Sequence, residues 1–204
     1  MKKYLLPIFI FLALMSMSFI PKNNKEIVVV IDASHGGTDF GAKHAAFAEK
    51  AIAASIAKKI YDLNSDSEII IRFTRIADEN LTLLERVKII NEINPDLAIS
   101  IHINSNKSTI NSGYQVFIPN KSATSEKSMA FAERLINSFE TNYPLKNLGL
   151  KSAPYMFLKN SNVPTIMIEL GYLSNEFDRN YITQNENQNE IAKMILDFIG
   201  SLKS

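Results

Sequence analysis

The chain has 204 residues, 46% hydrophobic and 21% charged, which is enough for one domain with a core of its own. It contains no cysteine, which excludes disulfide bonds, thiolate metal ligands and a lipid anchor on an N-terminal cysteine. The formal net charge is +1 and no long basic run follows residue 26, so nucleic acid is not expected as a partner.

The first segment of the chain is a short basic stretch followed by an apolar run. Met1-Lys2-Lys3 precedes the apolar residues 4–20, and a polar stretch follows them. This pattern predicts a signal peptide over residues 1–20 and an exported domain over residues 26–204, in the periplasm or cell envelope. An uncleaved membrane anchor is the alternative, although the run is short for a spanning helix. Either reading places the folded domain outside the cytoplasm.

Strand and helix patterns alternate along the rest of the chain. Runs rich in Val, Ile, Phe or Tyr predict strands over residues 26–32, 68–73, 96–103, 113–118, 155–158 and 164–169. Apolar residues at helical spacing predict helices over residues 48–63, 83–93, 125–140 and 188–202. Thr82 and Glu85 form the sequence of a capping box at the start of the second helix. The alternation predicts a single α/β domain with a mixed, mostly parallel sheet of about six strands and helices on both faces.

Two of the three histidines stand at the ends of apolar strands. His35 follows the run 27–31 and precedes two glycines, and His102 ends the run 97–101. Because ligands bind at the carboxyl ends of strands in open α/β sheets, both imidazoles are expected at one edge. A histidine bonded only to its loop neighbours is the alternative for His35 alone. His44, in a polar loop with no apolar strand behind it, is interpreted as a solvated loop histidine.

Two carboxylates are candidates for the same edge of the sheet. Glu49 stands at the start of the first long helix, where a carboxylate is also favoured by the helix dipole alone. Glu169 follows Ile166-Met167-Ile168, and an acid in so apolar a run is costly to bury unless it is paired or lies by a metal. A buried ion pair of Glu169 with Arg72 or Arg75 is the structural alternative. Two imidazoles and a carboxylate are a common ligand set for zinc.

These blocks together resemble the zinc-dependent N-acetylmuramoyl-L-alanine amidase family, in its amidase 3 catalytic type. The resemblance covers residues 27 to about 200, nearly the whole expected mature chain. The matching blocks stand in family order: Val29-Val30-Ile31-Asp32-Ala33-Ser34-His35-Gly36-Gly37-Thr38-Asp39, Glu49-Lys50, Thr74-Arg75 with Asp78, Leu83-Leu84-Glu85-Arg86, Ser100-Ile101-His102-Ile103-Asn104-Ser105 and Pro164-Thr165-Ile166-Met167-Ile168-Glu169-Leu170-Gly171-Tyr172-Leu173-Ser174-Asn175.

The resemblance implies a role for each candidate residue. His35, Glu49 and His102 would bind Zn²⁺, and Glu169 would be the catalytic acid and base. The substrate would be peptidoglycan, cut at the amide between the lactyl group of N-acetylmuramic acid and the L-alanine of the stem peptide. The implied fold is a mixed sheet flanked by helices.

Departures from the family pattern are small. Ser34 stands in place of a usual glycine, Phe40 in place of a common proline, and Tyr172 in place of a common phenylalanine. None of them removes an expected ligand, although they could alter the cleft wall around His35. The segment from His102 to Gly113 is short and polar, so no helix is expected to block the site.

Two other functions stay open on the sequence. A zinc peptidase acting on the stem peptide would use a similar ligand set. A non-catalytic peptidoglycan-binding module would keep the fold, although it would be expected to have lost at least one of the four candidate residues. The chain is expected to be a monomer, and an envelope regulator of unknown identity is left open.

Overall fold

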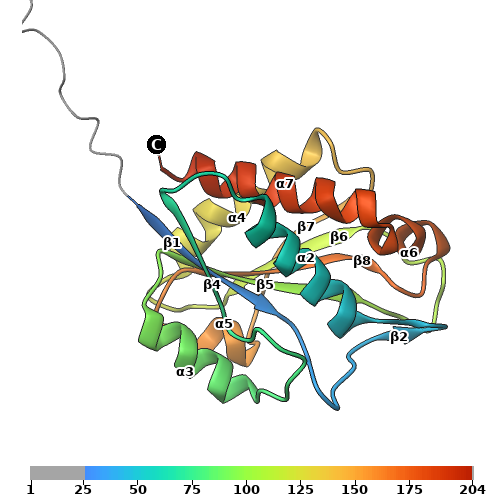
Figure 1. Ribbon diagram of the computed structural model, residues 1–204, viewed down its shortest axis with the longest axis horizontal. Coiled ribbons are helices and arrows are strands. Elements are labelled where there is room, and N and C mark those ends of the chain that lie inside the picture. The colour runs from blue at the N-terminus through green and yellow to red at the C-terminus, as the bar shows by residue number, and fades with distance from the viewer. Residues whose placement is uncertain (1–25, 204) are drawn as a thin grey trace, which may run out of the picture.

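A computed structural model of the protein describes residues 26–203. Its centre is a six-stranded sheet in the order β4-β1-β5-β8-β6-β7 (Figure 1). β1, β4, β5 and β8 are parallel to one another, whereas β6 runs antiparallel to β8 and parallel to β7. The strands are β1 (Ile27–Ala33), β4 (Ile69–Phe73), β5 (Leu97–Asn104), β6 (Tyr114–Pro119), β7 (Asn147–Ala153) and β8 (Thr165–Tyr172). The mixed, mostly parallel sheet predicted from the sequence is confirmed.

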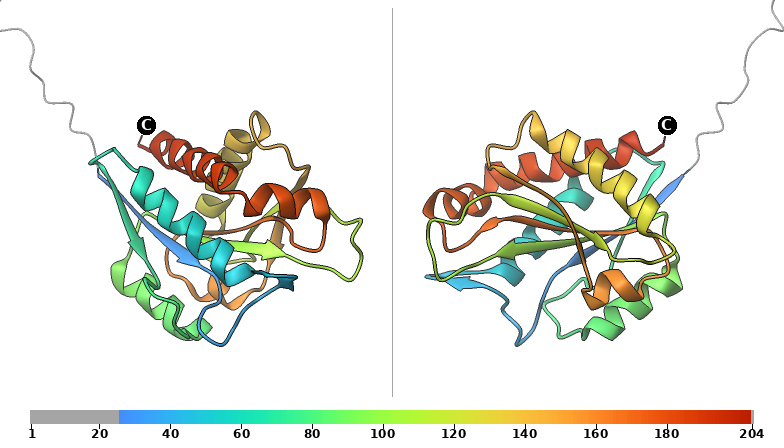
Figure 2. Two further views of the ribbon diagram at one scale, coloured as in Figure 1. Left: turned by 45° about the vertical axis from the view of Figure 1, so that its right-hand side comes forward. Right: turned by 180° about the vertical axis from the view of Figure 1, so that it is seen from behind.

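Helices cover both faces of this sheet, as the alternating pattern predicted (Figure 2). One face carries α2 (Glu49–Leu63), α4 (Ser125–Glu140) and α7 (Asn185–Ser201). The other face carries α3 (Leu83–Ile93) and the short α5 (Met156–Asn160). The helix α6 (Glu176–Thr183) follows β8, and a small hairpin of β2 (Lys43–His44) and β3 (Phe47–Ala48) leads into α2. None of the described helices has the length and apolar character needed to span a membrane.

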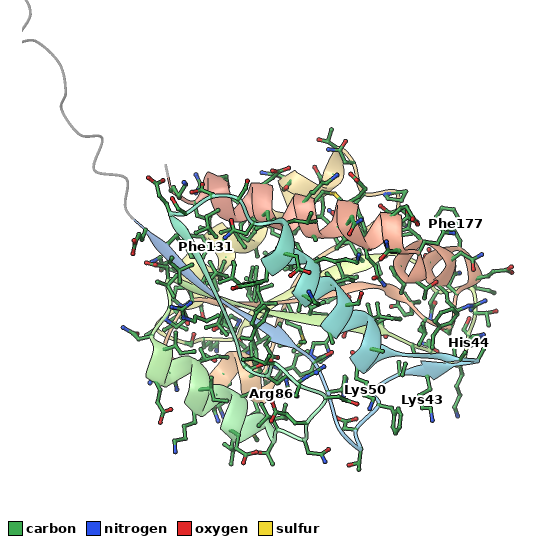
Figure 3. The ribbon with its side chains drawn as sticks, in the orientation of Figure 1. Lys43, His44, Lys50, Arg86, Phe131 and Phe177 are labelled. Carbon is green, nitrogen blue, oxygen red and sulfur yellow. The ribbon has the colours of Figure 1, made fainter. Side chains whose placement is uncertain are left out.

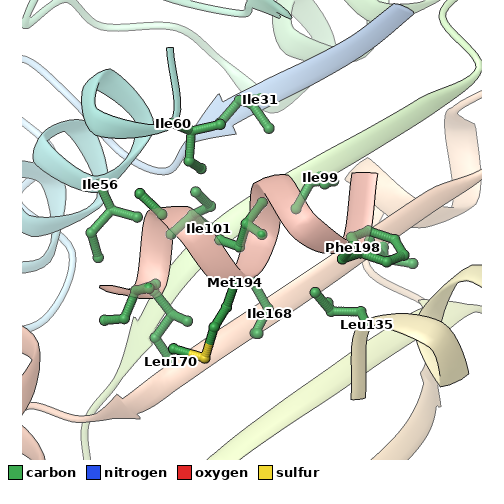
Figure 4. Close-up of a cluster of buried hydrophobic side chains, with 14 of the residues drawn as sticks. Ile31, Ile56, Ile60, Ile99, Ile101, Leu135, Ile168, Leu170, Met194 and Phe198 are labelled. Atoms are coloured by element: carbon green, nitrogen blue, oxygen red, sulfur yellow. The ribbon is translucent and has the colours of Figure 1, made fainter. Parts of the chain in front are cut away.

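The larger core lies between the sheet and the face with three helices. Ile56 and Ile60 of α2 and Phe198 of α7 pack over Ile99 and Ile101 of β5, all of them almost fully buried (Figure 4). Burying one such side chain contributes about 1.5–3 kcal/mol. A smaller core lies on the other face of the sheet, where α3 and α5 pack against it. The central strands are therefore apolar on both sides, as a parallel sheet between two helical layers requires.

One predicted strand is wrong. Residues 155–158 are not extended: Met156–Asn160 forms α5, and the sixth strand is instead β7. Phe157 and Leu158 are both buried, whereas a strand on a sheet surface would bury alternate residues. β7 has a polar, glycine-containing sequence because it is an edge strand with little of it buried.

The other predicted elements are close to the observed ones. The predicted helix over residues 188–202 begins three residues earlier, at Asn185. The capping box of α3 is present, with Thr82 and Glu85 each bonded to the other's backbone N–H. α6 and the β2–β3 hairpin were not predicted. The predicted signal peptide over residues 1–20 lies outside the described residues.

Candidate metal and catalytic site

Three of the predicted site residues meet at the carboxyl edge of the sheet. His35 follows β1, His102 lies near the end of β5, and Glu49 is the first residue of α2. The carboxylate of Glu49 lies between the two rings: Oε2 is 3.1 Å from Nε2 of His35, and Oε1 is 2.9 Å from Nδ1 of His102. One ligand atom from each residue lies within 4.8 Å of the other two. Two imidazoles and one carboxylate at this spacing fit a divalent metal with nitrogen and oxygen ligands.

The Glu49 carboxylate is held in place by backbone donors as well. The N–H of Ala42, just before the β2–β3 hairpin, donates to Oε2 at 2.8 Å, and the N–H of Ile103 donates to Oε1 at 3.0 Å. The hydroxyl of Ser34 donates to Oε1 at 3.4 Å. Burial by itself would raise the pKa of Glu49, but the hydrogen bonds with His102 and His35 outweigh it and lower the pKa. The carboxylate is therefore ionised, as a metal ligand must be.

His35 is oriented by its backbone and by a second carboxylate. Its φ of +57° lies in the left-handed region, which is uncommon for a residue other than glycine. Its Nδ1 is 2.7 Å from Oδ2 of Asp39, which leaves Nε2 toward Glu49. Burial alone would lower the pKa of His35, but Glu49 and Asp39 outweigh it and raise the pKa to about 9. A carboxylate on the far nitrogen of a histidine is a common way to orient a metal ligand.

Gly41 lets the loop pass close to this pair. Its φ is +62°, and a Cβ there would come within 2.4 Å of Oε2 of Glu49 and 2.5 Å of Cδ2 of His35. Any side chain would displace one of the two groups. Asp39 ends the family-like block of the sequence and Gly41 follows just beyond it, but no pattern assigned either residue a contact with the site.

Glu169 lies next to His102, because β5 and β8 pair in register at these two residues. Its Oε2 atom is buried and has no hydrogen-bond partner within the described part of the chain. Burial raises the pKa of Glu169 to about 7. The alternative of an ion pair is not observed, because the donors of Arg72 and Arg75 go to backbone carbonyls. A carboxyl group with a pKa near neutrality can both accept and return a proton.

A cavity of about 470 Å³ opens beside these groups. His35, His102 and Glu169 line one part of it. Apolar side chains from the start of α3, the segment before it and the region of α5 also line the cavity: Leu81, Leu83, Tyr155, Met156 and Phe157. The site is thus open to a substrate of some size, and both ionisable and apolar side chains line it.

A buried polar network borders the same cavity, and Asp32, Ser100 and Arg86 belong to both. Asp32 of β1 pairs with Nη1 of Arg86 at 2.6 Å and accepts the hydroxyl of Ser100 at 2.7 Å and that of Thr74. Arg86 also donates to the carbonyls of Ala33 and His35. The network fixes the end of β1 from which His35 projects. Figure 3 shows Arg86 at the lower centre of the molecule.

His44 is not part of the site. It lies partly exposed on the β2–β3 hairpin, well away from Arg86 in Figure 3, and the His35–Glu49–His102 group does not include it. The segment between β5 and β6 is a loop without a helix over residues 105–113. No helix from that segment covers the cavity, as the short polar sequence predicted.

Comparison with known proteins identifies the family. A family model described as N-acetylmuramoyl-L-alanine amidase matches residues 29–201. The chain belongs to this family. The family depends on a metal ion, and the His35–Glu49–His102 group is a possible site for one.

Individual relatives agree with this assignment. The chain is 31% identical over 176 residues to the probable cell wall amidase LytH of Staphylococcus saprophyticus, across 85% of this chain and 57% of LytH. It therefore spans a little over half the length of that relative. Among solved structures, the catalytic domain of the amidase CwlV from Bacillus (Paenibacillus) polymyxa has a TM-score of 0.80 at 28% identity, covering 86% of this chain and 97% of that chain.

A third relative was solved with a partner. The CwlD amidase of Clostridioides difficile, in complex with the GerS lipoprotein, has a TM-score of 0.76 at 27% identity, covering 86% of this chain and 97% of that chain. The single α/β domain with its mostly parallel sheet is thus the fold of known amidase structures.

Proposed function

We propose that this chain is a zinc-dependent N-acetylmuramoyl-L-alanine amidase. It cleaves the amide between the lactyl group of N-acetylmuramic acid and the L-alanine of the stem peptide in peptidoglycan. One observation carries the proposal: His35 and His102 of the candidate metal group line the same cavity as Glu169, whose buried Oε2 has no partner among the described residues, in a chain of this family. The choice of zinc over another metal is supported by the ligand types, two imidazoles and one carboxylate.

Each residue has a role in this proposal. His35, Glu49 and His102 hold the metal, and Asp39 keeps the His35 ring turned toward it. A bound zinc ion would polarise the scissile carbonyl and lower the pKa of a water molecule. Glu169 takes the proton from the attacking water and returns it to the nitrogen of the departing alanine. Its position beside His102 supports this role, as does its pKa of about 7.

The location of the reaction follows from the substrate. We propose that residues 1–20 are a signal peptide, that residues 26–204 form the catalytic domain, and that the protein acts in the cell envelope. The relatives named as cell wall amidases support an envelope-acting protein. The lipoprotein bound to CwlD supports a search for an envelope regulator of this chain too.

The test is a digest of purified peptidoglycan by the purified chain, read by mass spectrometry with and without a zinc chelator. The proposal predicts free stem peptides with an N-terminal L-alanine, lost on chelation and restored by Zn²⁺. Cleavage within the stem peptide would favour the zinc peptidase instead. Binding without cleavage by zinc-loaded protein would favour the non-catalytic module or a missing activator.

A further inference from the structure

Arg75 lies two residues beyond β4, and its side chain is almost completely buried at 6% exposed. Its guanidinium group makes four hydrogen bonds, all of them to backbone carbonyls. Nε donates to Ala33 at 2.9 Å, and Nη2 donates to both Ser34 at 3.0 Å and Lys50 at 3.2 Å. Nη1 donates to Ala77 at 3.1 Å, within its own loop. One side chain therefore joins three separate segments of the chain.

Two of these segments carry the candidate metal ligands. Ser34 directly precedes His35, and Lys50 directly follows Glu49 in the first turn of α2. The same Nη2 atom bonds to both carbonyls, so it bridges the His35 segment and the Glu49 helix. The other direct contacts between the two segments involve side chains of the segments themselves: Glu49 with the His35 ring and the Ser34 hydroxyl, and Lys50 Nζ with the Gly37 carbonyl. Arg75 differs from these contacts because a single atom of it holds the backbone carbonyls next to both proposed ligands.

The His35 segment needs such a restraint because its backbone is strained. A non-glycine residue with φ near +57° costs about 1 kcal/mol or more and persists where its surroundings hold it. The carbonyls before and at His35 are occupied by Arg75 and Arg86. The chain is also tightly packed there, since a Cβ on Gly36 would meet the Nε of Arg75 at 3.2 Å.

Arg75 differs from Arg86 in its partners. Arg86 is paired with the Asp32 carboxylate and reaches the His35 segment but not α2. Arg75 has no carboxylate within ion-pair distance among residues 26–203. Its direct partners are carbonyl dipoles, and Asp78, Asp32 and Glu79 act on its charge only from a greater distance. A buried cation of this kind is costly. If Arg75 served only the stability of the fold, a well-packed apolar side chain at this position would stabilise the protein more.

We propose that Arg75 is a positioning residue that sets the separation of His35 and Glu49, and through it the affinity of the site for a divalent metal. It is not a catalytic residue, because it contacts neither the cavity nor the proposed ligand atoms. The proposal rests on the proposed metal site. A lysine in its place keeps the charge but not the planar fork that reaches several carbonyls at once.

The test measures the Zn²⁺ affinity of the metal-free full chain by competition with a chromophoric chelator. Arg75→Lys and Arg75→Gln are expected to bind Zn²⁺ about 10- to 100-fold more weakly than the wild type. Arg72→Lys is the matched control, because Arg72 is exposed and bonds only to the carbonyl of its neighbour Ile71. Phe198→Leu changes a buried core residue on α7. It is expected to lower the stability of the protein and leave its Zn²⁺ affinity unchanged, so it controls for loss of stability.

The outcomes separate this inference from the proposed function. If the wild type binds no Zn²⁺, the proposed metal site fails. If the wild type binds Zn²⁺ and both Arg75 variants bind it within twofold as well, the inference about Arg75 alone is overturned. Circular dichroism and thermal melts of each metal-free variant establish that the affinity refers to folded protein.

A second measurement uses the wild type, in case the Arg75 variants do not fold. The Nε–H of Arg75 donates to Ala33 and belongs to the same planar guanidinium group as the bridging Nη2, so its proton–nitrogen NMR signal reports on how that group is held. Saturating Zn²⁺ is expected to shift this signal and to slow its exchange with water, while the signal of Arg72 stays unchanged. An Arg75 signal unaltered by saturating Zn²⁺ would overturn the proposal.

Discussion

The surroundings of Glu49 and of Glu169 are opposite in character, although both carboxylates lie beside His102. Glu49 has hydrogen-bond partners on both oxygens, from two histidine rings and two backbone N–H groups. Glu169 has a buried Oε2 without a partner among the described residues. The pKa of Glu49 is lowered by its partners, and that of Glu169 is raised to about 7 by burial.

This difference separates two chemical roles. A carboxylate that stays ionised is suited to hold a metal, whereas one with a pKa near neutrality is suited to move a proton. Neighbouring acids whose surroundings drive their pKa values apart are a general sign of such a division. The comparison predicts that changes at the two positions have different consequences, and each of the following predictions tests it.

The substitution Glu169→Gln is expected to have the largest effect, and that effect is on catalysis. Removing the group that moves the proton should lower kcat about 10²- to 10⁴-fold. The Zn²⁺ content of the purified variant should equal that of the wild type, because Glu169 is outside the ligand group. The measurement is the initial rate of peptide release from peptidoglycan together with metal analysis of the same sample. Activity close to that of the wild type would show that Glu169 is not the proton carrier.

The stability of the metal-free protein should depend on pH through Glu169. Its folded-state pKa is raised from 4.5 to about 7, so the protonated form is favoured by folding. This contribution is present below about pH 4.5 and is lost as the pH rises through 7. At pH 8 the variant Glu169→Gln should therefore be more stable than the wild type by roughly 3 kcal/mol.

Urea unfolding of both proteins in chelator, at pH 4.5 and at pH 8, measures this difference. The advantage of the variant should shrink at the lower pH, where the wild-type carboxyl is protonated as well. An advantage of equal size at both pH values would contradict the raised pKa.

A smaller effect is expected from Ser34→Ala on the Glu49 side. The Ser34 hydroxyl gives Oε1 its longest hydrogen bond, at 3.4 Å, while shorter bonds from His102 and Ile103 remain. Its loss should weaken Zn²⁺ binding by about 0.5–1 kcal/mol, or two- to fivefold. Ser138→Ala is the control, because that hydroxyl bonds to the Met194 carbonyl between α4 and α7. A loss above tenfold for Ser34→Ala alone would make this hydroxyl a main support of Glu49.

The sequence predicted which residues meet at the edge of the sheet, because the central strands have a strongly apolar sequence. β1, β5 and β8 are buried, so they read as continuous apolar runs, and the reactive residue of each stands at or near its end. Parallel pairing then brings His35, His102 and Glu169 to one edge. The proposed ligand role of Glu49 came from the resemblance, since a carboxylate in a first helical turn has an ordinary explanation too.

Other parts could not be predicted for physical reasons. β7 is an edge strand with little buried surface, so its sequence lacks the apolar alternation that marks strands. Met156–Asn160 is apolar enough to resemble a strand, but it packs as one helical turn under the sheet. Arg75 acts through backbone carbonyls, which every residue carries, so no pattern of side chains reveals its partners.

The most direct test of the division between the two carboxylates is a calorimetric titration of the metal-free proteins with Zn²⁺. The wild type and Glu169→Gln should each bind one Zn²⁺ with similar affinity, whereas Glu49→Gln should bind it at least about 10-fold more weakly. Equal affinity for Glu49→Gln, or loss of Zn²⁺ binding by Glu169→Gln, would contradict the account.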